Sequence, residues 1–445
     1  MIKTFVNAWK IPELRKKILF TALIVLIFRI GSVIPVPFVD IGKEGILGGD
    51  YAGTFLQYLN MMTGEAFSYG TLFAMSITPY INSSIIMQLL TVAIPALERL
   101  SKEGEEGRKK IATITRYVTV VLALMQSTAY YFFLKNGNYL SLSATGAEYT
   151  GFWAVLQAVT IILCFTAGAA LIMWLGEQIN DKGIGNGISM ILFAGIVSRI
   201  PTMLANLFSP EMGVGYWAYG GVYRVLAPIV VVIMLLMIAY IVWMDNAERR
   251  IPVQYAKRVV GRKMYGGQST HIPIKVNMSG VMPIIFASSI LSLPPTIQLF
   301  VTNPSEGWKK FFEVFQADHW AYGIMYFFLI IFFAYFYATI QYNPIEMANN
   351  IRKNSGAIPG IRPGKPTSDY IGKILSRITL LGALLISVVA IFPIIYSQVC
   401  GLFLEHGMNI SLGGTSIIIL VGVALETVKQ LESQMMMRHY KGFLD

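Results

Sequence analysis

The side chains that could do acid–base, nucleophilic or metal chemistry are few in this sequence and far apart. The histidines and cysteines are His271, His319, His406, His439, Cys164 and Cys400. The histidines have no metal-ligand spacing, and no nucleophile, general base and orienting group form a recognisable motif. Two isolated thiols in apolar surroundings make neither a disulfide framework nor a metal site. We therefore expect a protein that is not an enzyme and needs no cofactor.

Charged side chains are almost absent from the long apolar stretches of the chain. Arg29 is the clear exception, while Glu177, Asp245, Glu248 and Glu426 lie at or near the ends of such stretches. A transporter coupled to protons or ions normally needs buried carboxylates or histidines for its relay. The sequence therefore disfavours that class of protein.

Uncharged polar side chains within the apolar stretches are more informative. Asn82, Gln88, Gln126 and Asn186 lie in or beside them, where each amide needs a hydrogen-bond partner or water. Individually they are typical of ordinary hydrogen bonds between helices. Together they are consistent with a wet or separable seam.

The elements that carry these residues are predicted to be membrane-spanning helices. The chain is 55% apolar and 13% charged over 445 residues, with mean hydropathy +0.59, whereas soluble domains are about one quarter charged. Apolar runs of about 18 or more residues recur, and such runs can cross a bilayer as helices. The predicted spans are 18–36, 72–97, 111–134, 152–175, 187–207, 225–244, 278–301, 322–342, 374–396 and 412–428. The predicted fold class is an all-α polytopic membrane protein of ten spans.

The formal net charge of +11 has a topological explanation. With ten spans and a cytoplasmic N-terminus, all but seven of the 35 lysines and arginines fall on the cytoplasmic side, as the positive-inside rule requires. The seven others are Arg29, Lys43, Lys135, Arg199, Arg224, Lys309 and Lys310. Most of the charge therefore sets orientation, which weakens a nucleic-acid-binding interpretation. Both termini are predicted to be cytoplasmic, and no removable signal peptide is evident before the first span.

The stretch from Gly48 to Gly70 does not fit a plain bundle. It is moderately apolar and flanked by glycine, but too short to cross about 30 Å of hydrocarbon as a helix. Irregular backbone at membrane depth survives only where protein or a water-filled cavity surrounds it. We expect this segment to re-enter from outside, which implies a cavity open to the exterior.

A short sequence echo links the second and seventh predicted spans. The run Pro79 to Ile85 resembles the run Pro283 to Ile290, and five spans separate the two. Copies that run oppositely through the membrane are typical of inverted-topology repeats. Chance similarity between helix starts is the alternative, but a genuine repeat would place spans 1–5 and 6–10 in two halves with a site or pore between them.

Two loops on the predicted cytoplasmic side, from Asn246 to Asn277 and from Tyr342 to Lys373, are longer than an antiparallel helix pair requires. They combine clustered bases with tyrosines and a Pro/Gly-rich stretch at 358–364. Topology requires only charge, so their length favours docking to a large anionic surface, such as ribosomal RNA or an acidic motor protein.

Four blocks in these regions resemble the SecY family, and the resemblance extends over nearly the whole chain. They are 102–109 (KEGEEGRK), 174–189 (WLGEQI leading into GIGNGIS), 255–277 (YAKR through QSTHIPIKVN) and 359–364 (PGIRPG). Any one block could mislead, but all four in order among ten spans are highly specific. The resemblance implies an hourglass channel between two five-helix halves, open across the membrane for secreted chains and sideways into lipid for membrane segments.

The family's constriction is a ring of aliphatic side chains, which carries over onto Ile77, Ile81, Ile188, Leu192, Ile285 and Ile419. Spacing supports this ring independently, because Ile77/Ile81 and Ile188/Leu192 are i, i+4 pairs on one helix face. Ile81 and Ile285 also hold equivalent places after the prolines of the echo. Leu192 departs from the expected isoleucine, a volume-conserving change. Without the resemblance, each of these residues would be interpreted as core or lipid-facing.

The same resemblance assigns three further groups of residues. The plug that fills the outer funnel at rest lies at about 50–68 and includes Thr54, Phe55, Leu56, Tyr58, Leu59, Asn60, Met61 and Met62. The lateral gate, where spans 2 and 3 face spans 7 and 8, carries the polar groups Asn82, Gln88, Gln126, Asn186, Ser288 and Ser289. Contacts to the ribosome or to the SecA ATPase are expected at Lys257, Arg258, Arg262, Lys263 and Arg362.

The resemblance also implies the setting of the protein. SecE and SecG are expected as complex subunits, SecA and the ribosome as cytoplasmic partners, and a signal peptide with its nascent chain or preprotein as the cargo. The expected location is the bacterial plasma membrane, with the lipid bilayer itself as a partner. The chain has no phosphate-binding loop, so the driving energy must come from a partner. The predicted organisation is a cytoplasmic N-terminus (1–17), halves at 18–214 and 215–430, and a cytoplasmic tail (431–445).

Two other classes of function compete with a passive protein-conducting channel. A secondary transporter fits the inverted halves, but it requires a discontinuous helix lined by ionisable groups, which are nearly absent here. A structural scaffold of a membrane complex predicts no conductance in any mutant.

Overall fold

The computed structural model describes residues 2–41, 45–46, 60, 63–141, 149, 151–209, 216–255, 258–260, 263–265, 269–298, 305–316, 319–403 and 413–441. The helices of the first half are α1 (Ile2–Lys10), α2 (Pro12–Gly31), α4 (Thr78–Ala93), α5 (Pro95–Lys102), α6 (Glu105–Asn136), α7 (Phe152–Lys182), α8 (Gly187–Val197) and α9 (Ile200–Phe208). Those of the second half are the 3-10 turn η1 (Tyr216–Tyr219), α10 (Gly221–Asn246), α11 (Met282–Leu291), α12 (Leu293–Gln298), α13 (Glu306–Val314), α14 (Trp320–Gln341), α15 (Pro344–Lys353), α16 (Lys365–Phe403) and α17 (Gly414–Lys441). The predicted helical membrane fold is thereby confirmed.

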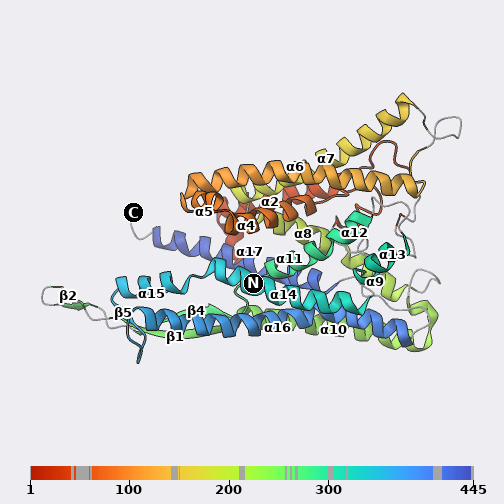
Figure 1. Ribbon diagram of the computed structural model, residues 1–445. Coiled ribbons are helices and arrows are strands. Elements are labelled where there is room, and N and C mark those ends of the chain that lie inside the picture. Colours follow the sequence, from red (N-terminus) through yellow and green to blue (C-terminus); the bar gives the residue numbers. More distant parts are fainter. Residues whose placement is uncertain are drawn as a thin grey trace.

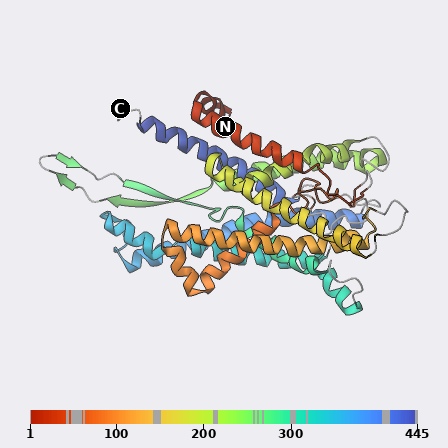
Figure 2. The same ribbon diagram turned by 90° about the horizontal axis from the view of Figure 1, so that it is seen from above.

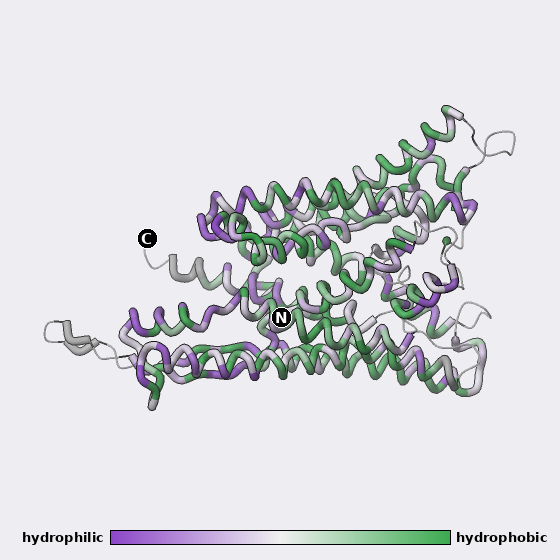
Figure 3. The backbone as a smooth tube through the Cα atoms, viewed as in Figure 1, coloured by the Kyte–Doolittle hydropathy of each residue, from purple (hydrophilic) through white to green (hydrophobic). Residues whose placement is uncertain are grey.

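The long helices run side by side as one bundle. Figure 1 shows α6 and α7 along one side and α10, α14 and α16 along the other, with α8, α11 and α17 between them. The N-terminal helix α1 packs against α17, so the two ends of the chain lie close together (Figure 2). Hydrophobic residues dominate the middle of the bundle, and hydrophilic residues gather toward its ends (Figure 3). This distribution is the one expected of a bundle immersed in lipid.

Each predicted span contains helix, but not every helix is long or apolar enough to cross a membrane. Among the described residues, seven helical stretches meet that test, or eight if the pair α4 and α5, bent by 101°, is one span. Helix α2 carries Arg15, Lys16 and Lys17 near its start and ends at Gly31, before the predicted boundary. The stretch 278–301 is divided between α11 and α12. The count of ten therefore stays a prediction.

Small β-sheets lie at one end of the bundle, and they were not predicted from the sequence. Strand β1 (Glu248–Tyr255) pairs antiparallel with β4 (Ser269–Lys275) and β5 (Gly356–Ala357), while β2 (Arg258–Val260) pairs with β3 (Lys263–Tyr265). Ile251 and Val253 alternate with exposed residues along β1 and are buried. This period of two was a usable strand signal in the sequence. Strands β1 to β4 all lie in the first of the two long loops. Together they form an extended strand arm at one end of the bundle (Figure 1).

Two helix crossings depend on glycine. A Cβ at Gly187 would lie 1.9 Å from the carbonyl oxygen of Gly176, so α8 and α7 approach more closely than any side chain permits. A Cβ at Gly414 would lie 2.0 Å from the carbonyl oxygen of Val389, which brings the start of α17 onto α16. Small residues at such crossings let helices associate in lipid, where no hydrophobic force drives them together. The glycines thus fix α8 and α17 in the centre of the bundle.

Candidate functional site

The six aliphatic residues predicted to form a ring come from four helices of both halves. Ile77 and Ile81 belong to the start of α4, Ile188 and Leu192 to α8, Ile285 to α11 and Ile419 to α17. All six belong to, or pack against, one hydrophobic cluster that extends through the centre of the bundle. Five are buried and Ile188 is half-buried, whereas lipid-type positions such as Val232 on α10 are 54% exposed. The six side chains therefore face protein rather than the outer surface.

The sequence echo corresponds to a local structural similarity between α4 and α11. Each helix has proline at its second position, which is compatible with the first turn of a helix. The residues before the two helices, Ile77 and Val281, have similar backbone angles, with φ of −93° and −86°. A Cβ at Gly422 on α17 would lie 2.9 Å from a Val281 methyl group, so the start of α11 contacts α17 close to Ile419. The two half-helices therefore enter the same central region.

Helix α8 owes its start to Asn186. The Asn186 side-chain oxygen accepts hydrogen bonds from the backbone N–H groups of Ile188 and Ser189, at 3.1 and 3.5 Å. Capping of this kind satisfies donors that a helix N-terminus otherwise leaves unpaired. Asn186 was predicted as a polar group of the lateral seam, but here its oxygen holds Ile188 and Leu192 in place on α8. A capping signal was readable from Asn before an apolar helix.

The other predicted seam residues divide by how well their polar atoms are satisfied. Gln88 donates to the Ser84 hydroxyl at 3.4 Å within α4, and Ser288 donates to the Ile285 carbonyl at 3.0 Å within α11. Asn82 differs, because it is buried and no residue that the structure describes provides its Oδ1 with a hydrogen-bond partner. Gln126 on α6 and Ser289 on α11 are half-buried. Since a buried, unpaired acceptor is costly, Asn82 is the seam residue that most needs a functional explanation.

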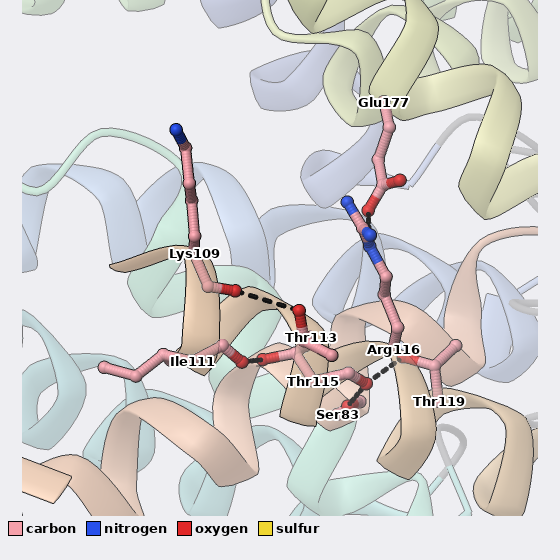
Figure 4. Close-up of polar contacts among 8 residues, drawn as sticks. All are labelled: Ser83, Lys109, Ile111, Thr113, Thr115, Arg116, Thr119 and Glu177. Carbon is pink, nitrogen blue, oxygen red and sulfur yellow. Dashed lines mark hydrogen bonds and ion pairs between the residues drawn. The ribbon is translucent and has the colours of Figure 1, made fainter. Parts of the chain in front are cut away.

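The helices beside this seam are joined within their own half. Figure 4 shows the Ser83 hydroxyl of α4 donating to the Thr115 carbonyl of α6 at 2.7 Å, and the Arg116 Nε of α6 donating to a Glu177 oxygen of α7 at 2.7 Å. Residues of these three helices are thus tied into one unit. Two polar contacts between the halves involve α17, where Thr4 meets Glu432 and Thr427 meets the Met190 sulfur.

Most of the predicted plug lies outside the described residues. Thr54, Phe55, Leu56, Tyr58, Leu59, Met61 and Met62 are in that group. Asn60 is described and buried, and its Oδ1 accepts a hydrogen bond from the Ser68 N–H at 3.0 Å. The Tyr130 hydroxyl of α6 donates to the Phe67 carbonyl, which fastens the same turn to the first half. Asn60 therefore organises the described end of the predicted plug.

The predicted partner contacts lie on the strand arm and the second long loop. Arg258 and Lys263 belong to β2 and β3, whereas Lys257 and Arg262 lie outside the described residues. Arg362 is exposed, and its carbonyl accepts a hydrogen bond from the Thr367 hydroxyl at 2.9 Å. A separate hydrophobic cluster joins β1 and β4 to α15, α16 and the loop before α16. The two loops therefore pack together as one unit rather than as two independent segments.

Sequence reasoning missed one charged cluster and found no metal site. Arg199 was counted only as a basic residue away from the cytoplasm, and Glu65 only as part of the re-entrant stretch, yet the two form an ion pair at 3.1 Å. A buried partner across 134 positions has no local signal in a single sequence. Within the described ranges, no group of three His, Cys, Asp or Glu side chains is placed to hold a metal ion.

The chain is similar to a known family and to full-length bacterial relatives. The SecY family model matches residues 71–428. "Protein translocase subunit SecY" of Streptomyces galbus is 42% identical over 457 residues, with 100% of both chains covered. The protein of the same name from Mycobacterium bovis is 41% identical over 462 residues, again with 100% of both chains covered.

Solved structures share the fold at low sequence identity. "The structure of a protein conducting channel" aligns with TM-score 0.59 and 17% identity, covering 94% of this chain and 92% of that one. "Sec61 in the Canine ribosome-channel complex from the endoplasmic reticulum" aligns with TM-score 0.56 and 15% identity, with the same coverage.

Proposed function

The chain belongs to the SecY family and is the channel subunit of a protein translocase, and we propose that it passes unfolded secretory polypeptides across the plasma membrane and releases transmembrane segments sideways into lipid. It is a multi-pass membrane protein that conducts polypeptide without chemistry of its own. We further propose which residues form the constriction, which helices form the lateral gate, which partners bind and how the chain is oriented in the membrane.

One observation carries the constriction. Aliphatic side chains from α4, α8, α11 and α17, contributed by both halves, belong to or pack against one buried hydrophobic cluster. An apolar constriction can dewet, so it closes to ions without forming bonds that would have to be broken. The branched side chains can move aside around an extended peptide of any sequence. We propose that Ile77, Ile81, Ile188, Leu192, Ile285 and Ile419 form this constriction.

Lateral release is supported by a difference between the contacts that join the two halves at α17 and those that join them at α4 and α11. The α17 side carries side-chain contacts between the halves, including Thr4 with Glu432 at 3.0 Å. Elsewhere α4 packs against α11, and Asn82 of α4 has a buried oxygen for which the described residues provide no hydrogen-bond partner. We propose that α4 and α6 separate there from α11 and α14, and that the Asn82 amide meets the passing segment or water.

The orientation and partners follow from charge and from the family. Lysines and arginines gather in the strand arm and the loop around Arg362, which we assign to the cytoplasm together with both termini. This basic surface fits ribosomal RNA or the SecA ATPase, since either presents negative charge. One relative structure is entitled a ribosome-channel complex. SecE and SecG are the proposed companion subunits, in the bacterial plasma membrane.

Ion conductance tests the constriction directly. Replacing Ile81 and Ile285 together by glycine removes two branched side chains from the ring, so water and ions should cross the resting channel. We expect a measurable leak conductance in planar bilayers containing the purified complex, where the unchanged protein is closed. The same recording separates a channel from a scaffold, which conducts in no variant.

The control is an equal change on the outside of the same bundle. Ile86 on α4 and Ile229 on α10 are 38% and 43% exposed, and replacing both by glycine imposes a similar loss of helix propensity without touching the ring. This variant should stay closed. An unchanged resting conductance in the Ile81→Gly/Ile285→Gly protein would contradict the proposal that these residues form the constriction.

A further inference from the structure

The most buried ion pair of the described residues joins the end of the predicted plug, at Glu65, to the α8–α9 junction, at Arg199. An Arg199 Nη2 atom lies 3.1 Å from a Glu65 oxygen, and the two side chains are 15% and 30% exposed. Every other ion pair described has at least one side chain that is 40% or more exposed. Arg199 lies between the end of α8 and the start of α9.

A second arginine, Arg29 of α2, lies beside the same turn. A Cβ at Gly64 would lie 2.7 Å from the Arg29 Nη1, 2.8 Å from the Ser198 hydroxyl and 3.0 Å from the Gly195 carbonyl. The turn at Gly64 is therefore pressed against both α2 and the end of α8. Arg199 pairs with Glu65, and Arg29 adds a second positive charge next to Gly64.

The backbone of this turn is held in an unusual conformation. Gly64 and Glu65 have φ of 65° and 77°, in the left-handed region that a residue with a side chain rarely adopts. Hydrogen bonds enforce it, because the Glu65 N–H donates to the Asn60 carbonyl at 3.0 Å and the Thr63 hydroxyl donates to the same oxygen at 3.1 Å. A strained residue that its surroundings hold in place often has a functional role. In this conformation the Glu65 carboxylate forms its ion pair with Arg199.

The cluster contains two positive charges, Arg29 and Arg199, and one negative charge, Glu65. Nη1 of Arg29 and Nη1 of Arg199 are both buried, and no described residue provides either with a hydrogen-bond partner. Among the described residues, Glu65 is the carboxylate that forms an ion pair in this cluster, with Arg199. Removing one partner of a buried pair leaves an uncompensated charge, which is much more costly than never having the pair. Withdrawal of the turn would leave two such cations. The turn is therefore held in place by charge as well as by hydrogen bonds.

We propose that Glu65, Arg199 and Arg29 form an electrostatic latch that fastens the turn at 63–70 to α2 and to the α8–α9 junction and keeps the resting channel closed. This rests on the proposed channel function, because the latch acts on the segment predicted to fill the outer funnel. A translocating chain opens the channel by displacing the turn from its two arginines. The latch thus sets the open probability without taking part in the constriction.

Single-channel recording of the complex without a translocating chain tests the latch. Glu65→Gln and Arg199→Gln should each raise the open probability roughly tenfold or more, because each breaks the Glu65–Arg199 ion pair and leaves its other member without its partner. The double variant removes both members of that pair, so its effect should be smaller than the product of the two single effects. Arg29→Gln keeps the Glu65–Arg199 ion pair and should not raise the open probability.

Exchange of the charges separates the latch from a loss of folding. Glu65→Arg combined with Arg199→Glu keeps two cations and one carboxylate in the cluster, and it should return the open probability toward that of the unchanged protein. Arg116→Gln breaks an ion pair between α6 and α7 and should have no effect. Single variants that stay closed, or whose effects multiply as independent changes, would overturn the latch. If they stay closed while Ile81→Gly/Ile285→Gly leaks, the latch fails and the constriction stands.

Discussion

At the scale of single residues, the informative side chains are those whose bonding is incomplete. Asn82 and Asn277 are both buried, and each has an Oδ1 without a partner. They differ in the other amide atom, because the Asn277 Nδ2 donates to Asp245 at 3.1 Å. Asn277 thus joins the end of α10 to the segment before α11. No such hydrogen bond to another helix is described for the Asn82 side chain. This agrees with a position at an interface between helices that opens.

Replacing Asn82 should therefore stabilise the closed protein. Asn82→Leu removes an unpaired buried acceptor and keeps a similar side-chain size, so the free energy of unfolding should rise by about 1–3 kcal/mol. Asn277→Leu is the matched change and should lower it by about 1–3 kcal/mol, because the Asp245 carboxylate loses its donor. Thermal unfolding of the purified protein in detergent measures both. Equal effects of the two variants would contradict the distinction drawn between them.

At the scale of elements, the placement of short and broken helices decides where the ring residues meet. Helix α8 can lie in the centre because it crosses α7 at Gly176 and Gly187 without intervening side chains. Helices α4 and α11 begin at Thr78 and Met282, each with proline at its second position, and residues at their starts belong to the central hydrophobic cluster. A straight span at either position would carry its aliphatic residues past the centre. The breaks are therefore part of the site.

A single methyl group at the α7–α8 crossing should be intolerable. The Cβ of Gly187→Ala would overlap a backbone oxygen of α7, and because backbone cannot move aside cheaply we expect a loss of about 3 kcal/mol or more. Gly307 in α13 has nothing within 4 Å of its Cβ position. Gly307→Ala should therefore be neutral or stabilise by up to about 1 kcal/mol through helix propensity. Yield of folded protein and thermal unfolding distinguish the two, and normal folding of Gly187→Ala would refute the close crossing.

At the scale of the whole molecule, charge is divided between the two ends of the bundle. The end with the strand arm, α15 and the chain termini carries most lysines and arginines and has a small hydrophobic core of its own. That core gives the arm a fixed base, so its basic residues are presented together. The opposite end carries few basic residues, among them the exposed Arg224.

Reversing one charge on the basic end should weaken partner binding without opening the channel. Arg362→Glu should lower the affinity for ribosomes or SecA and reduce the slope of log affinity against log salt by about 1, as expected for the loss of one phosphate-type contact. Arg224→Glu, at the opposite end, should leave binding unchanged. Co-sedimentation over a salt series measures both. If Arg362→Glu binds as the unchanged protein does, this loop is not the docking surface.

Composition, length of apolar runs and placement of lysine and arginine determined that this chain is a helical membrane protein, because the bilayer imposes those properties on any sequence that spans it. Ordered motifs identified the family, and the Pro79 and Pro283 echo anticipated the related starts of α4 and α11. The alternation along β1 and the asparagine before α8 were readable signals, but the tertiary structure alone decided that the stretch 278–301 is divided between α11 and α12 and that β1 pairs with β4 and β5. It alone brought Glu65 to Arg199 and Arg29, because pairing between distant residues depends on how helices pack and leaves no periodic or local pattern to read.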